Sequence, residues 1–209
     1  MRKTLSLLAF FAVICVGVGA DVVFSNFGSG DTFDLSQGWG VSGPTSLFGV
    51  EWDQAAAFTP WGDFFLGEVD VAITNTSGTA QIDVIVADDN AGVPGNILDQ
   101  TSVTAPGAAT IVTATFSGTV PLTTGQQYWV WLSAPDDGLS SWYWNVMGDV
   151  DLRAMGTNLS SGGSWAASTG NARSAFRVEG AILVPEPGTF VLLGLGAVGM
   201  VLYRRRKQS

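Results

Sequence analysis

Several short segments of this chain alternate between apolar and polar residues, and clusters of turn-forming residues separate them. Residues 69–74 and 82–86 alternate in this way, with Asn-Thr-Ser-Gly between them at 75–78. A period of two places apolar side chains on one face of a β-strand, and Asn, Ser and Gly favour turns. The pattern therefore predicts short antiparallel strands rather than helices.

The same character continues towards the C-terminus. Further strands are expected at 111–116, 128–133, 142–146 and 176–182, and a loop is expected at 90–96. No long segment between residues 21 and 183 has the 3.6-residue period of a helix, and no linker divides this region. The sequence predicts one all-β domain at 21–183, a jelly-roll-like antiparallel β-sandwich.

The N-terminus has the three parts of a secretory signal peptide. Arg2 and Lys3 precede an apolar run at 5–18, and the small residues Gly19 and Ala20 follow it. This order predicts a signal peptide at 1–20, cleaved before Asp21. An uncleaved membrane anchor is the alternative interpretation.

The C-terminal residues 184–209 also divide into three parts: a proline-containing motif at 184–188, an uncharged segment at 189–203 and a basic tail at 204–209. As a helix, the 15 residues of the middle segment would span about 22 Å, somewhat less than the ~30 Å hydrocarbon core of a bilayer. We expect a short transmembrane helix that flanking cations complete by snorkelling. The membrane stop and cytoplasmic end are assigned to Arg204, Arg205, Arg206 and Lys207.

This C-terminal order resembles the PEP-CTERM sorting signal of Gram-negative bacteria, and Pro185, Glu186 and Pro187 match the motif that gives the signal its name. The resemblance implies export across the inner membrane, anchoring in that membrane through the C-terminal helix, and processing by exosortase. It then implies a cell-surface or extracellular location. The two prolines also prevent a regular strand or helix, which suits a segment that a protease must bind.

The region between the signals resembles the choice-of-anchor type of β-sandwich ectodomain that often accompanies PEP-CTERM signals. The segments that carry this likeness are 57–60, 67–69, 92–98 and 121–129. They are loose patterns, and the resemblance implies a fold and a location but no active site.

Charge and composition exclude several classes of function. Residues 21–183 contain 17 acidic residues and three arginines, a net charge of −14, so a nucleic-acid surface is excluded. The chain has no histidine, which excludes Ser-His-Asp catalysis and His-ligated zinc. Its one cysteine, Cys15, lies in the signal peptide, so the domain has no disulfide. The sequence predicts no cofactor and no metal centre.

Tryptophan is the main candidate for a binding surface. Trp129 and Trp131 lie two residues apart on one expected strand, and Trp142 and Trp144 do so on the next. If those strands pair, four indoles line one face and can stack on sugar rings. The alternative is that the same side chains form a tryptophan-rich core, because the positions between Trp129 and Trp131 and on either side of them are apolar too.

Acidic residues suggest two further possibilities. Loops at 88–90, 136–138 and 149–151 are rich in Asp and offer oxygen ligands for calcium, although Asx turns explain the same residues without a metal. Paired carboxylates such as Glu51 with Asp53, or Glu68 with Asp70, are a minimal requirement for glycoside hydrolysis. Nothing in the sequence singles out one pair.

The sequence therefore predicts an exported surface or extracellular-matrix protein with a non-catalytic ectodomain, and exopolysaccharide is its candidate partner. A carbohydrate-binding module that uses the four tryptophans is the alternative. A carboxylate-based glycoside hydrolase is a weaker one.

Overall fold

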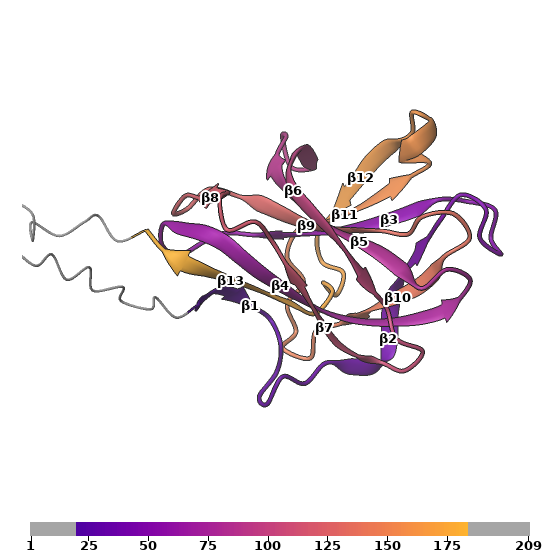
Figure 1. The fold of residues 1–209 in the computed structure, drawn as a ribbon, viewed down its shortest axis with the longest axis horizontal. Helices are drawn as coiled ribbons and strands as arrows, with labels where there is room; N and C mark the ends of the chain where they lie inside the picture. Colours follow the sequence, from indigo (N-terminus) through magenta and orange to yellow (C-terminus); the bar gives the residue numbers. More distant parts are fainter. Residues whose placement is uncertain (1–19, 184–209) are drawn as a thin grey trace, which may run out of the picture.

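The computed structural model describes residues 20–183, which form an all-β domain (Figure 1). The sorting segment predicted at 184–209 and nearly all of the signal peptide predicted at 1–20 lie outside the described residues. Within residues 20–183, no helix combines the length and the apolar character that a membrane span requires.

Thirteen strands and one short 3₁₀ helix make up the domain. They are β1 (Asp21–Ser25), β2 (Asp34–Ser42), β3 (Trp52–Phe58), β4 (Phe64–Ser77), β5 (Gln81–Asp89), β6 (Pro94–Thr104), β7 (Thr110–Thr115), β8 (Pro121–Leu122), β9 (Tyr128–Ser133), β10 (Leu139–Trp144), β11 (Arg153–Thr157), η1 (Leu159–Ser161), β12 (Ser164–Ser168) and β13 (Phe176–Ile182).

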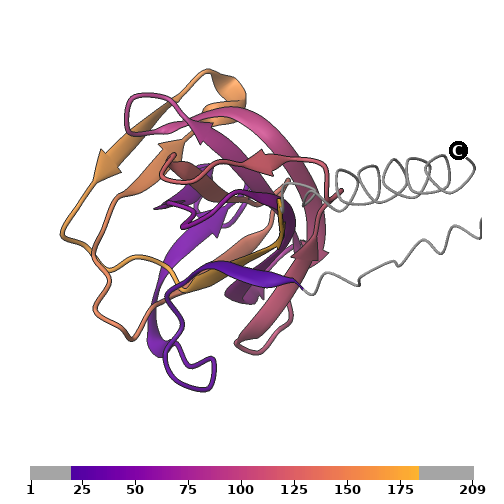
Figure 2. The same cartoon turned by 90° about the vertical axis from the view of Figure 1, so that its left-hand side faces the viewer.

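All the strands belong to one antiparallel sheet that curls on itself. Its main path runs β1-β13-β4-β10-β2-β3-β9-β5-β6, and the β11–β12 hairpin adds to the free edge of β3. The 14-residue β4 carries β13 and β10 end to end along one edge, and β8 and β7 along the other. Figure 2 shows the strands running around a common interior. The predicted antiparallel all-β fold is confirmed, and the jelly-roll strand order stays a prediction.

The main core fills the interior between the two halves of the curled sheet. Strand β9 shows how alternation sorts its side chains: Tyr128, Val130 and Leu132 face this core, whereas Trp129 and Trp131 face the opposite side. On that opposite side the β11–β12 hairpin covers a second apolar cluster with Ala154 and Trp165. Strand β3 therefore has covered faces on both sides, and its run Ala55–Ala57 is buried throughout.

The turn expected at 75–78 lies later in the chain, because residues 75–77 continue β4 and the connection to β5 occupies 78–80. It joins strands that do not pair. Strand β4 ends at Ser77 and β5 begins at Gln81, and the two have no common ladder. Gly78 has φ of +69°, and a Cβ at this position would lie 2.1 Å from the carbonyl oxygen of Asp137. Glycine is thus required here by backbone conformation and by space.

The two ends of the described chain lie side by side. Strands β1 and β13 pair antiparallel, with Asp21 opposite Gly180 (Figure 1). The N–H of Leu183 donates to the carbonyl oxygen of Asp63, 2.9 Å away, so the chain is held up to the residue where the sorting segment begins.

Candidate functional site

The four tryptophans predicted as one row lie on strands that are not neighbours. Strand β9 lies between β3 and β5, whereas β10 lies between β4 and β2. The pairing that the row of four indoles required is therefore not formed. Trp129 and Trp142 are both 0% exposed, and their indole N–H groups donate to Asp89 Oδ1 at 2.9 Å and to the Ala175 carbonyl at 3.0 Å. These two indoles belong to the interior.

The other two tryptophans of the predicted row are partly exposed and have separate partners. Trp131 meets Trp165 edge to face, with ring centroids 5.1 Å apart and planes at 90°. Trp144 packs against Trp39 with a centroid distance of 5.2 Å. The tryptophans thus form two Trp–Trp pairs. Each pair joins one tryptophan of the expected row to one that the sequence did not single out.

The first pair belongs to a group that we name the outer-face cluster: Trp131, Trp165, Asp53, Ser133 and Asp83. Strand register brings these residues together. On β5 and β9, Asp83 lies opposite Ser133. Gly156 links the other two strands, lying opposite Asp53 on β3 and opposite Trp165 on β12. A Cβ at Gly156 would lie 2.5 Å from Leu159 Cδ1 and 3.2 Å from Trp165 Cζ3, so glycine at this position leaves room for both side chains.

Asp53 is the unusual member of the outer-face cluster. It is 1% exposed, and neither carboxylate oxygen has a hydrogen-bond partner of normal geometry among the described residues. Burial raises the pKa of Asp53 to about 7, and the charges of Glu51 and Asp83 add to the rise, while polar contacts with Ser133 and Trp131 oppose it. Near neutral pH the group can therefore either donate or accept a hydrogen bond.

The outer-face cluster combines two kinds of group that sugars require. Indole faces stack on the C–H side of a pyranose ring, and carboxylate oxygens accept hydrogen bonds from hydroxyl groups. Trp131 and Trp165 supply partly exposed aromatic surface, and Asp83 supplies a partly exposed carboxylate on the same face of the sheet, with Oδ1 accepting from Ser102 at 2.5 Å. The arrangement suits binding of a neutral saccharide.

The second aromatic pair surrounds an arginine. The Arg153 guanidinium carbon lies 3.7 Å from the ring centroid of Trp39, and its Nη2 donates to Gln54 Oε1 at 2.6 Å. Gln54 in turn donates to the carbonyl oxygen of Gly40 at 2.8 Å. We name Arg153, Trp39, Trp144 and Gln54 the Arg153 cluster.

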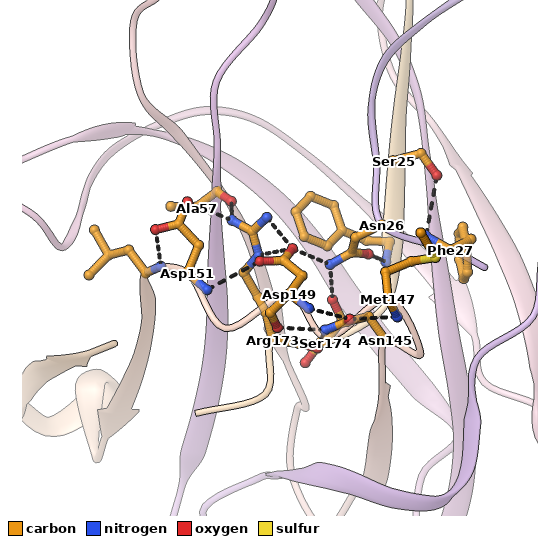
Figure 3. A network of polar contacts seen from close by, with 12 residues as sticks. Ser25, Asn26, Phe27, Ala57, Asn145, Met147, Asp149, Asp151, Arg173 and Ser174 are labelled. Carbon is orange, nitrogen blue, oxygen red and sulfur yellow. Dashed lines mark hydrogen bonds and ion pairs between the residues drawn. The ribbon is translucent and has the colours of Figure 1, made fainter. Parts of the chain in front are cut away.

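A third polar group connects loops at one end of the sheet (Figure 3). Arg173 donates from Nε to Asp149 Oδ2 at 2.8 Å, and also bonds through Nη2 to the same oxygen and through Nη1 to the Ala57 carbonyl. Asn26 donates to Asp149 Oδ2 at 3.0 Å and accepts from the Phe176 N–H at 2.8 Å. The network ties the segments around β1, β3 and β13 together.

A small hollow of about 120 Å³ lies beside this network. Its walls are Phe24, Ala57, Phe58, Thr59, Gln127, Asp151 and Arg173. The guanidinium of Arg173 is already bonded to Asp149 and to the Ala57 carbonyl. The hollow is large enough for a few water molecules. We assign it a structural role.

The carboxylates of the three acidic loops accept hydrogen bonds from other residues of the domain. Asp88 accepts from the Asn96 N–H at 2.6 Å, Asp137 from the Thr79 N–H at 2.9 Å, and Asp149 from the Asp151 N–H at 3.1 Å. The Asp149–Asp151 bond spans two residues, as the Asx-turn interpretation predicts, whereas the other two bonds join residues that lie further apart in the sequence. Among residues 20–183, no group of three or more acidic side chains is placed to hold a metal ion.

The carboxylate pairs named for hydrolysis also have structural partners. Glu51 accepts from the N–H of Ser160 at 3.2 Å. Asp70 is ion-paired with Arg177, and Glu68 accepts from Thr115 Oγ1 at 3.5 Å. Asp53 is the member of these pairs that has no such partner.

Sequence reasoning missed Trp39, Trp165 and the importance of Arg153. Both tryptophans are placed by the pairing of strands that lie far apart in the sequence. The apolar periodicity of a single segment does not reveal such pairing. Arg153 could have been singled out from the sequence, because it is one of three basic residues among residues 21–183.

Comparison with known protein families identifies the C-terminal segment. Residues 183–207 match the model of the PEP-CTERM protein-sorting motif, and the match contains Pro185, Glu186 and Pro187. No curated protein matches the chain. The molecule is thus an exported protein with an all-β ectodomain. More particularly, it carries a PEP-CTERM motif, and exosortase processes and sorts proteins with this motif to the cell surface, as the resemblance implied.

Proposed function

We propose that this protein is a non-catalytic component of the extracellular matrix, and that its ectodomain binds exopolysaccharide through the outer-face cluster. The observation that supports this function best is the edge-to-face pair of Trp131 and Trp165, partly exposed beside Asp83 and Asp53. This pair supports a carbohydrate-binding surface formed by β3, β5, β9 and the β11–β12 hairpin. That surface takes the place of the row of four indoles.

The proposal extends to both ends of the chain. Signal peptidase removes residues 1–20, the segment 189–203 holds the chain in the inner membrane, and Arg204–Lys207 stay on its cytoplasmic side. Exosortase then acts near Pro185-Glu186-Pro187. The ordered stages leave the domain at the surface, where exopolysaccharide is available.

A binding experiment tests the function of the ectodomain. The full-length chain, purified in a non-ionic detergent, is mixed with exopolysaccharide from the native host, and the bound fraction is measured after sedimentation of the polymer. The double variant Trp131→Ala/Trp165→Ala is expected to bind at least about tenfold more weakly, a loss of roughly 1.4 kcal/mol.

Trp61→Ala is the matched control. Trp61 is 63% exposed, and its indole N–H donates to the Val22 carbonyl near β1, away from the outer-face cluster. This variant is expected to bind like the parent chain. Equal binding by the double variant and the parent would reject the outer-face cluster as the binding surface.

A further inference from the structure

Arg153 differs from the other two arginines of the domain in having no carboxylate partner. Arg173 pairs with Asp149 and Asp151, and Arg177 pairs with Asp31, Asp70 and Glu179. The side chain of Arg153 makes one hydrogen bond among the described residues, to the neutral Gln54. Among the described residues, none of the 17 carboxylates of the domain forms an ion pair with this guanidinium.

The isolation of Arg153 is costly because the residue is buried. It is 7% exposed, and burial lowers its pKa. A buried cation without a counter-ion is rare, because the lost hydration is not replaced. The ring of Trp39 compensates in part by a cation–π contact, and this leaves the guanidinium short of an acceptor.

Other unsatisfied donors surround the same place in the fold. The indole N–H of Trp144, which packs against Trp39, is buried without a partner. Ser168 lies opposite Arg153 in the β11–β12 ladder, and its hydroxyl is also buried without a partner. Two buried groups near Arg153 thus lack a partner among the described residues: an indole N–H, which donates, and a hydroxyl, which can donate or accept.

We propose that the Arg153 cluster is a second ligand site, which binds the carboxylate group of an acidic sugar. A carboxylate presents two coplanar acceptor oxygens, and a guanidinium is the side chain best matched to them. The partly exposed rings of Trp39 and Trp144 supply apolar surface on which the attached sugar ring can rest. The site is separate from the outer-face cluster and does not depend on it.

Indole N–H resonances report on this site directly. The full-length chain is labelled with ¹⁵N in a non-ionic detergent and titrated with D-glucuronate, with D-glucose and with acetate at 0.15 M NaCl, where the repulsion from the net negative domain is screened. We expect glucuronate to shift the resonances of Trp39 and Trp144 saturably, and glucose and acetate at the same concentrations to leave them in place. The Trp165 resonance is expected not to move.

Variants of Arg153 separate ligand binding from a structural role. Arg153→Gln is expected to abolish the shift, and Arg153→Lys, which keeps the charge but loses the planar fork, to weaken binding at least about tenfold. If the glutamine variant does not fold, the weaker binding expected of the lysine variant still tests the role of the guanidinium. The variant Trp131→Ala/Trp165→Ala is expected to bind glucuronate like the parent, which distinguishes this proposal from the proposed function.

Three results would overturn the proposal. The first is an absence of glucuronate-induced shifts in the parent chain. The second is an equal shift with acetate, which would remove the sugar from the assignment. The third is unchanged glucuronate binding by a folded Arg153→Gln variant.

Discussion

Arg173 and Asp149 form an ion pair across 24 positions of the sequence, and both side chains are largely withdrawn from water. Their side chains are 4% and 18% exposed. The pair joins the loop after β10 to the loop before β13, and Asn26 joins the segment after β1 to the same carboxylate (Figure 3). Three distant stretches of chain thus converge on one oxygen atom, Asp149 Oδ2.

Asp149→Asn is expected to destabilise the domain strongly. The substitution keeps the shape of the side chain but leaves the guanidinium of Arg173 buried without its main counter-ion. Breaking a buried pair in this way costs about 3–5 kcal/mol, which lowers the melting temperature of a domain of this size by roughly 6–20 °C. Thermal unfolding followed by circular dichroism measures the change.

Asp151→Asn is the matched control for this pair. The Asp151 carboxylate is 74% exposed and lies 3.8 Å from Arg173. Exposed ion pairs contribute about 1 kcal/mol or less, so this variant is expected to melt within a few degrees of the parent. Equal melting temperatures for the two variants would contradict a central role for Asp149.

Asp53 is expected to make stability fall as pH rises from about 4 to 7. Its pKa is raised in the folded chain from 3.8 to about 7, so over this interval the folded state holds a proton that the unfolded state has released. The free energy of unfolding then decreases by roughly 1 kcal/mol per pH unit. Urea titrations at several pH values measure this slope, and Asp53→Asn is expected to flatten it.

Asp137 provides a contribution of opposite sign. Hydrogen bonds from the Thr79 side chain and N–H hold the pKa of Asp137 below its usual value, so its contribution is lost as pH falls through that lowered pKa. Asp137→Asn should therefore leave the slope between pH 4 and 7 unchanged. If Asp53→Asn leaves the pH dependence of the free energy of unfolding unchanged, that dependence arises from another group.

Trp142→Ala is expected to be among the most destabilising single substitutions. The indole is 0% exposed, lies 6.0 Å from the Phe176 ring and donates to the Ala175 carbonyl. Truncating a buried tryptophan costs about 3–5 kcal/mol. The midpoint of urea unfolding measures the loss, with Trp61→Ala as the exposed control, expected to cost about 1 kcal/mol or less.

Substitution of Pro185, Glu186 and Pro187 by alanine is expected to block maturation. The prolines keep the segment out of regular structure, and exosortase acts on the sorting motif. The intact mass of the protein from the native host is the measurement. The variant should lack the first 20 residues but keep its C-terminal segment, and a fully processed variant would show that these residues are dispensable.

The sequence predicted local structure well where one face of a strand is buried. The expected strand at 176–182 coincides with β13, because alternation reports a one-sided environment. The strand expected at 128–133 coincides with β9, although both of its faces are apolar and packed. Strand β3 escaped prediction because both of its faces are covered, so Ala55–Ala57 show no alternation. Most of β6, including its exposed Asn96, is polar and escaped prediction for the opposite reason.

The candidate sites were less predictable than the strands. Trp131 was named as a candidate for an aromatic surface, but its partner Trp165 lies 34 positions away on a hairpin that the sequence did not reveal. The carboxylate of Asp53 was named as half of a pair, whereas its isolation comes from burial beneath that hairpin. Both relationships depend on which strands become neighbours, and non-local pairing leaves no periodic trace.

Strand β13 lies between β1 and β4 and is also the strand from which the sorting segment continues. A pull on the C-terminal end of the described domain would therefore enter it along β13, parallel to the strand axis. It is shared between two antiparallel ladders, whose hydrogen bonds lie across the direction of pull and must yield together.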